Sequence, residues 1–584
     1  MTDTPQAAAR PNATPRWRAT FAVLVLATVV RLAYLAQLRE SILFANPQGD
    51  AQLHFDLARE IAAGDWLGNK VFYYAPLYPY FVAVIFAACG TSMIAVVVLQ
   101  AILSVLDVWL VILLGERIFG RRVGLIAGGV AACYGPAVFY TGFLLKETLG
   151  LVLLDAFVVV ALALAARRTW WASFLPGFLL GLAALVRPNL LPLALPAALW
   201  LAIECCATAA RGVWTAALFV AGVAAALAPV AARNRIVSGE MVLISAHGGH
   251  NFFMGNRVGA TGVYEPLFAG GGQMPLDEER DARSIAEQAT GRPMTASQVS
   301  AYWYGRGWRE IRKYPGNFIR VTCKKFALFW NDYEVPDVQD FYYVRRACPA
   351  LWLAPFTFGI IAPLAGVGVF ASLRQWRSCV LPYLVVAGVL ATVVPFFIFA
   401  RYRLPVVSVL IVFAGAGVAR TAELFASRDG RRLAVSLAVA AGVAAFTNWP
   451  IYRPIAYIAT SYFNVGQLHR EAGHAKEAIA AWREAVRLNP AYRKPWRALG
   501  EAYFEAGRFA DAVAAFRHAA VFAPAGYSAD AELTYKMAVS CWHAGERDTA
   551  LELFRIGRAL WPNDERFQRA PADIGQPSEG SAPP

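Results

Sequence analysis

Long apolar runs separated by short polar connections fill residues 17–450 of this chain. A run of about 20 apolar residues is long enough to cross a bilayer as a helix. The first such run is 17–38, and it lacks a signal-cleavage pattern. Further spans are predicted at 123–140, 149–166, 172–187, 189–203, 213–231, 351–371, 379–399, 404–420 and 433–449. The pattern predicts an all-α, polytopic transmembrane helix bundle.

Two polar stretches interrupt the spans, at 39–72 and at 232–350, and the first 16 residues are expected to be a disordered cytoplasmic tail. Arginines gather in the short connections, and such connections lie on the cytoplasmic side. This places both long stretches, and the carboxyl end, on the outer side. The stretch 73–114 must then cross an odd number of times, once or three times.

The pattern changes at about residue 455 to amphipathic, charged helices with an internal repeat. Trp496, Gly500, Tyr503, Phe516 and their neighbours have equivalents 34 residues earlier, and a weaker third copy follows. This period is typical of tetratricopeptide repeats, in which each helix pair buries its apolar face only by stacking on the next. We therefore predict a tetratricopeptide helical solenoid over 455–566, followed by a disordered tail over 567–584.

Composition agrees with a membrane class, because 58% of the 584 residues are hydrophobic and only 16% are charged. The net charge of +14 raises the possibility of nucleic-acid binding. The arginines are spread over the connections between spans, which argues for membrane orientation instead. No nucleic-acid partner is expected.

The first outer stretch holds the leading catalytic candidate, Asp50, directly after Gly49 and at the start of a short surface helix. An acid held at the membrane rim is a functional candidate by default. The alternative is that Asp50 caps that helix. His54 lies four residues on, on the same helix face. It either orients the acid or faces the lipid headgroups.

Charged residues also stand where later spans begin. Lys146 and Glu147 open one span, and either they pair with each other or Glu147 is a second acid or supports the first. Arg187 precedes a proline between two spans, and Arg401, Tyr402 and Arg403 precede another. Guanidinium groups suit bidentate contact with phosphate. The alternative for each arginine is anchoring to lipid headgroups.

The long outer stretch begins with His247-Gly248-Gly249-His250 and continues to Asn256. Two histidines three residues apart suggest a metal, but no third ligand follows at helical spacing. We expect His250 and Asn256 to contact substrate, with a purely structural turn as the alternative. No cofactor is expected to be required, and a divalent metal stays open.

Taken in order, these motifs resemble a known family. The motifs are Gly49-Asp50, Ala75-Pro76-Leu77-Tyr78-Pro79, Lys146-Glu147, Arg187-Pro188, Asn251-Phe252 with Gly255-Asn256, and Arg401-Tyr402-Arg403-Leu404-Pro405. They resemble bacterial GT-C glycosyltransferases of the protein O-mannosyltransferase and aminoarabinose transferase type over about 17–450. Tyr74-Ala75 stands where some relatives carry a basic residue, and His54 replaces a familiar tyrosine.

The resemblance implies inverting transfer of a sugar from a polyprenyl-phosphate donor to a hydroxyl of a protein, lipid or glycan, at the outer face of a bacterial cytoplasmic membrane. It gives Asp50 the role of taking the acceptor's proton. Two other functions stay open: a non-catalytic scaffold that recruits partners through its repeats, and a polymerase or ligase of lipid-linked glycans. The sugar, the acceptor, the oligomeric state and the partner of the repeats are not specified by the sequence.

Overall fold

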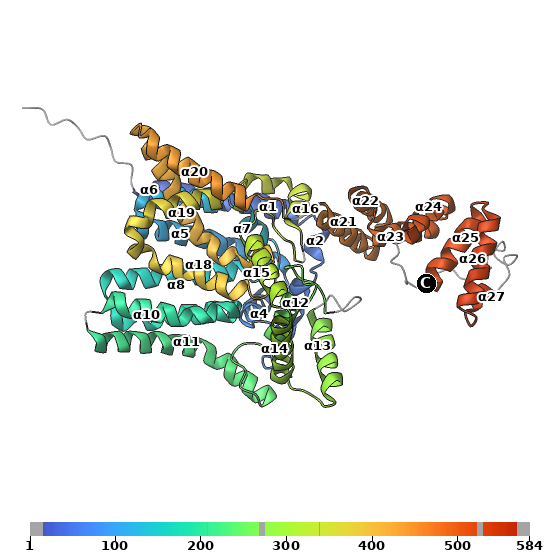
Figure 1. The fold of residues 1–584 in the computed structure, drawn as a ribbon, viewed down its shortest axis with the longest axis horizontal. Helices are drawn as coiled ribbons and strands as arrows, with labels where there is room; N and C mark the ends of the chain where they lie inside the picture. The colour runs from blue at the N-terminus through green and yellow to red at the C-terminus, as the bar shows by residue number, and fades with distance from the viewer. Residues whose placement is uncertain are drawn as a thin grey trace, which may run out of the picture. The chain divides into compact units, whose positions relative to one another are not determined.

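The computed structural model describes residues 16–206, 208–267, 275–337, 339–451, 454–521 and 530–568. They fall into two compact units, 1–452 and 453–584 (Figure 1). The described residues form helices and turns, with one isolated β-bridge between Tyr134 and Phe356. The all-α prediction is confirmed. The two expected disordered tails lie almost entirely outside the described residues.

The bundle of the first unit is built mainly from long apolar helices. They are α1 (Arg16–Leu38), α5 (Met93–Phe119), α6 (Arg121–Ala132), α7 (Gly135–Tyr140), α8 (Glu147–Arg167), α9 (Phe174–Val186), α10 (Ala194–Cys205), α11 (Ala209–Ser238), α17 (Phe358–Ser372), α18 (Val380–Val393), α19 (Leu404–Ala426) and α20 (Gly430–Thr447). Short 3-10 segments join several of them, namely η1 (Trp170–Ala172), η2 (Pro188–Leu193), η3 (Pro349–Leu353), η4 (Leu373–Cys379) and η5 (Ala400–Tyr402). Within the described ranges, eight helical stretches have the length and hydropathy to cross a membrane.

The structure describes two stretches in which the predicted crossings were irregular or open. In 73–114 the first helix, α4 (Leu77–Cys89), is apolar but has only 13 residues. Of the two helices in this stretch, only α5 has the length and hydropathy of a candidate membrane span. The predicted span 123–140 is divided at Cys133 into α6 and α7, because Gly135 and Pro136 start a new helix there.

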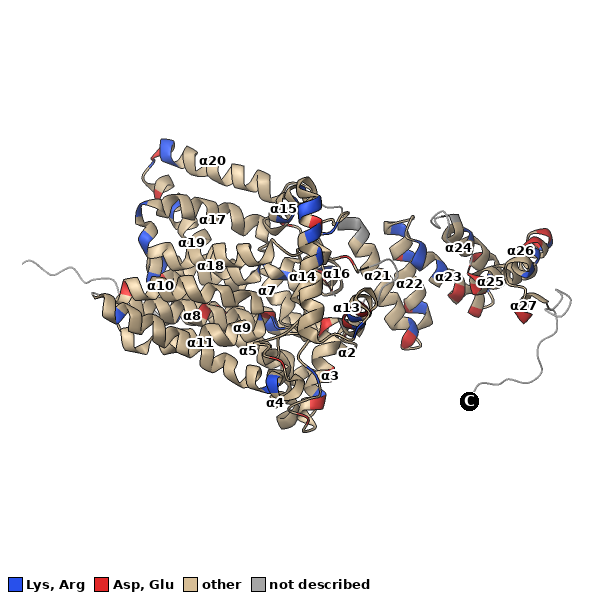
Figure 2. Ribbon diagram, turned by 60° about the horizontal axis from the view of Figure 1, so that its bottom comes forward, with Lys and Arg blue, Asp and Glu red and all other residues tan. Residues whose placement is uncertain are grey.

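The bundle has an arginine end and a cavity end. Helices α5 and α6 meet at the arginine end, and Arg122 there lies 4.0 Å from Glu423 near the end of α19. Arg167 ends α8 at the same kind of junction. Figure 2 shows this basic rim at the opposite end of the bundle from the helices of the long outer stretch. The charge distribution therefore gives the bundle two chemically different ends.

Close helix contacts depend on glycine at two crossings of the bundle. A Cβ atom at Gly222 of α11 would overlap the carbonyl oxygen of Phe174 on α9. A Cβ at Gly368 of α17 would overlap the carbonyl oxygen of Phe413 on α19 in the same way. Small residues at such crossings let helix backbones approach within a membrane, where packing replaces the hydrophobic effect.

The outer stretches form short helices that cover the cavity end. They are α2 (Ile42–Ala45), α3 (Asp50–Ala62), α12 (Gly248–Asn256), α13 (Pro275–Thr290), α14 (Ala296–Lys313), α15 (Pro315–Phe329) and α16 (Phe341–Ala347). Helix α12 packs on α14 through Phe252, Phe253 and Trp303.

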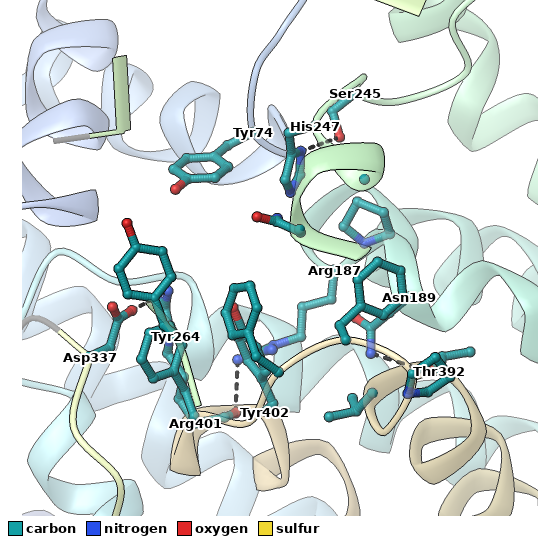
Figure 3. A pocket seen from close by; sticks show the side chains of 18 of the residues that line it. Tyr74, Arg187, Asn189, Ser245, His247, Tyr264, Asp337, Thr392, Arg401 and Tyr402 are labelled. Atoms are coloured by element: carbon teal, nitrogen blue, oxygen red, sulfur yellow. Dashed lines mark hydrogen bonds and ion pairs between the residues drawn. The ribbon is translucent and has the colours of Figure 1, made fainter. Parts of the chain in front are cut away.

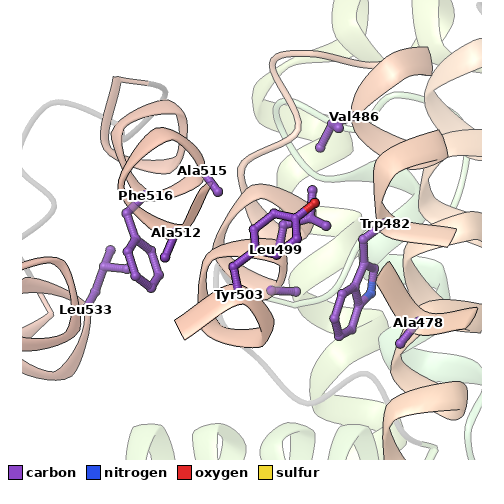
Figure 4. Close-up of a cluster of buried hydrophobic side chains, with 10 residues drawn as sticks. Ala478, Trp482, Val486, Leu499, Tyr503, Ala512, Ala515, Phe516 and Leu533 are labelled. Atoms are coloured by element: carbon purple, nitrogen blue, oxygen red, sulfur yellow. The ribbon is translucent and has the colours of Figure 1, made fainter. Parts of the chain in front are cut away.

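The second unit stacks three helix pairs. They are α21 (Pro454–Glu471) with α22 (Ala475–Leu488), α23 (Arg493–Glu505) with α24 (Phe509–Val521), and α25 (Ala531–His543) with α26 (Arg547–Leu560), followed by α27 (Glu565–Gln568). Helices α22 and α24 begin 34 residues apart, as predicted, whereas α26 follows α24 by 38 residues. Gly466 lies against Trp482, and Gly500 lies against Phe516 one period later. Figure 4 shows Trp482 and Phe516 in the buried cluster that joins the pairs. The solenoid prediction is confirmed.

Candidate active site

A cavity of about 660 Å³ opens at the cavity end of the bundle, between the outer helices and the ends of the spans (Figure 3). Its wall draws on segments that are far apart in sequence. Charged and hydrogen-bonding side chains of this wall come from Asp50, Tyr74, Lys146, Arg187, Asn189, Ser245, His247, Asn251, Tyr264, Glu278, Ser300, Tyr304, Asp337, Thr392, Arg401 and Tyr402. The cavity therefore combines carboxylates, cations and aromatic rings.

Asp50 reaches this cavity as the first residue of α3. Gly49 before it has φ = 56°, a left-handed conformation that favours glycine and turns the chain into the helix. The N-cap position of α3 is held by Gly49, which has no side chain, so Asp50 itself already belongs to the helix. Its carboxylate instead accepts a hydrogen bond of 2.5 Å from Nη2 of Arg401. The capping alternative is thus wrong, and Asp50 is one partner of a buried ion pair.

Arg401 is the centre of an ionic cluster. Besides Asp50, its guanidinium pairs with the carboxylate of Asp337 and lies 3.5 Å from Oε1 of Glu147. Arg187 donates a 2.8 Å hydrogen bond to the same Oε1 and a 3.0 Å bond to the carbonyl oxygen of Arg401. Five segments, 351 residues apart at the extremes, are held together by these contacts.

The arginines also stand over aromatic rings at the base of the cavity. The guanidinium carbons of Arg187 and Arg401 lie 6.0 and 5.6 Å from the ring centre of Tyr402. On the opposite wall, Nζ of Lys146 lies 5.3 Å from the ring centre of Tyr74. Such cation–π contacts stabilise buried cations and fix their direction. Three cations therefore line one cavity.

The two aspartates have very different acidities. Burial opposes ionisation of Asp50, but the charges of Arg401 and Lys146 outweigh it and lower the pKa to about 2. Burial raises the pKa of Asp337 to about 7, because the carboxylates of Asp50 and Glu147 add to the effect and Arg401 offsets only part of it. Burial and the two arginines lower the pKa of Lys146 to about 8. At neutral pH Asp50 is ionised, whereas Asp337 is half protonated.

Glu147 is a predicted catalytic residue that does not line the cavity. Its side chain is fully buried behind Arg187 and Arg401. It pairs with both arginines and not with Lys146 beside it, so the alternative of a local Lys146–Glu147 pair is wrong. Glu147 was predicted to be a second acid or to support the first; in the structure it is the counter-ion of Arg187 and Arg401.

His54 is buried one turn after Asp50 and stays outside the cavity. Its ring lies 5.0 Å from that of Tyr78, and neither ring nitrogen has a hydrogen-bond partner among the described residues. Burial, with the nearby charge of Lys146, lowers its pKa to about 3. His54 is therefore a neutral, packed residue, which excludes a headgroup-facing position.

Three further candidate residues lie behind the cavity wall and outside the main cavity. His250 Nε2 lies 2.8 Å from the hydroxyl of Tyr73 beside a smaller cavity. Asn256 donates to the carbonyl oxygen of Pro395 at 2.8 Å, which holds the wall segment 395–397. Arg403 is bound by the carboxylate of Glu334 and by backbone oxygens. The structure does not bring these three side chains to the main cavity.

Asp337, Tyr264 and Glu278 line the cavity but were not predicted as site residues from the sequence. Tyr264 donates a hydrogen bond to Glu278, and both line the cavity next to Asp337. Burial raises the pKa of Glu278 to about 7. These residues lie in an irregular polar stretch, where an acid or a tyrosine is ordinary and no periodic pattern marks it. His247 belongs to a motif that was noted, and it lines the cavity with Ser245 as its partner at 3.2 Å.

No group of three or more histidine, cysteine or acidic side chains is arranged to hold a metal within the described ranges. The carboxylates of Asp50, Glu147 and Asp337 face arginines instead. The residues present therefore form an ionic cluster whose cations suit an anionic ligand.

Comparisons with known proteins find a family model in each of the two units. Residues 74–232 match the family model described as dolichyl-phosphate-mannose-protein mannosyltransferase. Residues 459–492 match the tetratricopeptide repeat. The resemblance predicted from the motifs is thereby confirmed: the first unit is similar to membrane glycosyltransferases of this class, and the second carries tetratricopeptide repeats.

Solved structures of the same kind are similar to the chain. The oligosaccharyltransferase of Archaeoglobus fulgidus, in its apo form, has 14% identity and a TM-score of 0.41, over 77% of this chain and 58% of that one. ArnT from Cupriavidus metallidurans, bound to undecaprenyl phosphate, has 16% identity and a TM-score of 0.32, over 70% of this chain and 79% of that one. The chain thus spans 58% of the length of the oligosaccharyltransferase. No curated protein matches the chain.

Proposed function

We propose that this chain is an inverting membrane glycosyltransferase that moves a sugar from a polyprenyl-phosphate donor to a hydroxyl acceptor. The observation that carries the proposal is the cavity itself, in which an ionised carboxylate, Asp50, lies beside three cations. Those cations are Lys146, Arg187 and Arg401. A base and a site for a departing phosphate are the two requirements of this reaction.

The proposed reaction has one displacement. The acceptor hydroxyl gives its proton to the carboxylate of Asp50, and its oxygen forms a bond to the anomeric carbon of the sugar. The bond from that carbon to the phosphate oxygen breaks on the opposite face, so the configuration inverts. The lipid phosphate leaves with the electron pair, and Arg187, Arg401 and Lys146 stabilise its negative charge.

Arg401 links the two halves of this reaction. While it donates to Asp50, it keeps that carboxylate a weak base, with a pKa of about 2. A phosphate that attracts Arg401 releases part of this hold, and the basicity of Asp50 rises toward that of an ordinary buried carboxylate. The base is therefore activated when the donor is in place.

The arginine end of the bundle supports a direction for the reaction. Short connections rich in arginine stay on the cytoplasmic side. We place the cavity, and the repeats that follow α20, on the outer side of a bacterial cytoplasmic membrane. In this arrangement residues 17–450 form the transferase domain, and the repeats over 455–566 hold an acceptor or a companion protein.

The test compares Asp50→Asn with Asp56→Asn. Asp56 lies on the same helix, is partly exposed, and bonds only to Gln52 and Arg59 among the described residues. Cells that produce each variant, or no protein, are analysed by mass spectrometry of envelope proteins, lipids and glycans. We expect the sugar addition to fall by about 10²-fold or more with Asp50→Asn and to persist with Asp56→Asn.

Full activity of a correctly inserted Asp50→Asn protein would overturn the proposal. The mass added to the acceptor separates single transfer from a polymerase or ligase, because those add many sugars. Unchanged glycans in cells without the protein, together with a partner retained by the repeats, would favour the scaffold function.

A further inference from the structure

Asp337 is the most exposed carboxylate of the ionic cluster and lines the cavity with Arg401. Its side chain is 21% exposed, compared with 9% for Asp50 and 0% for Glu147. All three pair with Arg401, and both Asp50 and Asp337 do so through Nη2. Asp337 is therefore the partner of Arg401 that is most accessible for exchange with a phosphate.

The net charge of the cluster determines how strongly the cavity attracts a phosphate. Three cations, Lys146, Arg187 and Arg401, face three carboxylates, Asp50, Glu147 and Asp337. When these six groups are ionised and Glu278, which also lines the cavity, is protonated, the cavity is neutral, and an anion gains little from entering it. Loss of one negative charge leaves a net charge of +1, which matches a phosphodiester.

Only one of the three carboxylates is free to give up its charge. Glu147 is sealed behind both arginines and bonded to Arg187. Asp50 must stay ionised to act as a base. Asp337 reaches the cavity from the irregular segment between α15 and α16, and its carboxylate bonds to no side chain but Arg401 in the described part of the chain.

We propose that Asp337 is a positioning residue that holds Arg401 until the donor phosphate replaces it, and that donor binding is accompanied by proton uptake on the Asp337 carboxylate. This inference rests on the proposed function and adds a pH-dependent step to it. Arg401 exchanges one anion for another, so it keeps its direction toward the cavity throughout.

The groups around Asp337 set the pH range over which its carboxylate takes up a proton and donor binding changes. Burial raises its pKa to about 7, with Arg401 and Lys146 lowering it and Asp50 and Glu147 raising it. The other titratable groups that face it are Tyr74, Tyr140, Tyr264, Tyr402 and Glu278. The tyrosines stay neutral, because burial raises the pKa of each. A second anion near Asp337 favours its protonated form further, so donor binding strengthens as pH falls and weakens as pH rises through 7.

The experiment measures binding of the methyl ester of undecaprenyl phosphate to the purified full chain in detergent. This probe is a phosphodiester, so its charge stays at −1 across the range. If binding requires protonated Asp337 with a pKa of about 7, affinity falls about tenfold between pH 6 and pH 8 from this group alone, and about twentyfold in wild type once deprotonation of Lys146 is included. We expect Asp337→Asn to bind at both pH values nearly as wild type does at pH 6, with about a twofold loss at pH 8 from deprotonation of Lys146.

Two further variants control for other causes. Glu265→Gln removes a carboxylate that pairs with Arg257 and does not line the cavity, so the wild-type dependence should persist. Glu278→Gln removes the other cavity carboxyl group with a pKa of about 7, so any part of the pH dependence that Glu278 contributes is lost, and the part that Asp337 contributes should persist. Asp337→Ala also removes the charge and serves as a second variant if Asp337→Asn folds poorly. Its folding is checked by its thermal midpoint. In an activity assay, Asp337→Asn should lower the donor KM at pH 8 and leave kcat within about twofold.

The outcomes are distinct. An equal pH dependence in wild type and Asp337→Asn, or weaker binding by Asp337→Asn at pH 8, overturns the inference and leaves the proposed function standing. Wild-type protein that binds the probe at no pH overturns both. A purely structural role for Asp337 predicts a lower thermal midpoint and no change in the pH profile.

Discussion

Replacement of Glu147 by glutamine separates a supporting role from a catalytic one. The side chain is fully buried, and its Oε1 accepts a 2.8 Å hydrogen bond from Arg187 and lies 3.5 Å from Nη1 of Arg401. Glutamine keeps the size and one acceptor oxygen but removes the charge. Arg187 and Arg401 then face each other with one counter-ion fewer.

The expected loss of stability follows from the burial of the Glu147–Arg187 ion pair. Removal of one partner of a buried ion pair costs about 3–5 kcal/mol, because the remaining charge is left uncompensated. Glutamine retains the hydrogen bond, so we expect a loss of about 3 kcal/mol of stability. In a unit of this size that corresponds to a fall of about 3 °C in the thermal midpoint.

Thermal unfolding and sugar transfer are measured together on the purified protein. Glu147→Gln should lower both the thermal midpoint and kcat/KM. Glu116→Gln is the matched control, because Glu116 pairs with Arg121 at 3.5 Å at the arginine end and is 28% exposed. Such a surface pair contributes about 0–1 kcal/mol, so this variant should behave as wild type.

One result would refute the reasoning. If Glu147→Gln unfolds like wild type but is as inactive as Asp50→Asn, then Glu147 acts on the reacting atoms. In that case the second acid considered from the sequence is real, and the wall of the cavity must open to expose it.

Three other predictions concern the rest of the molecule. Trp482→Ala removes a fully buried ring that donates a hydrogen bond to the carbonyl oxygen of Phe463, and should destabilise the repeats by about 3–5 kcal/mol in the isolated 453–584 unit, measured by denaturant unfolding. Gly222→Ala forces a methyl group onto the carbonyl oxygen of Phe174 and should lower the thermal midpoint of the bundle, whereas Gly442→Ala, with open space around it, should not. Glu278 has a pKa raised by burial to about 7 in the folded state, so its contribution to stability is full below about pH 4.5 and lost as pH rises through 7. Glu278→Gln should therefore flatten that part of the pH dependence of the thermal midpoint.

Hydropathy predicted the helix bundle because each span carries its own signal. A run such as 149–166 must be a membrane helix whatever its neighbours do, and the structure has α8 there. The signal fails where a crossing is irregular. The stretch 123–140 is apolar throughout, and its break at Cys133 depends on Pro136 and on contact with Phe356.

The site was only partly predictable, for a related reason. Asp50 and Arg401 stand out because a charge is unexpected at the mouth of an apolar run. Arg403 carries the same local signal, yet the 3-10 turn of η5 directs it to Glu334 and directs Arg401 to Asp50. No sequence period distinguishes two arginines two residues apart in such a turn. Asp337 gave no signal at all, because an acid in a polar loop is common.

The cluster also explains how a membrane enzyme can keep three cations ready for a phosphate. Buried cations without counter-ions are costly, so carboxylates must lie beside them. Every such carboxylate weakens the attraction for the substrate. An arrangement with one sealed anion, Glu147, one anion with a chemical task, Asp50, and one exchangeable anion, Asp337, satisfies both demands. The sealed anion keeps the arginines in place, and the exchangeable one yields its position on Arg401 to the donor, so Asp50 becomes a stronger base only once the leaving group is bound.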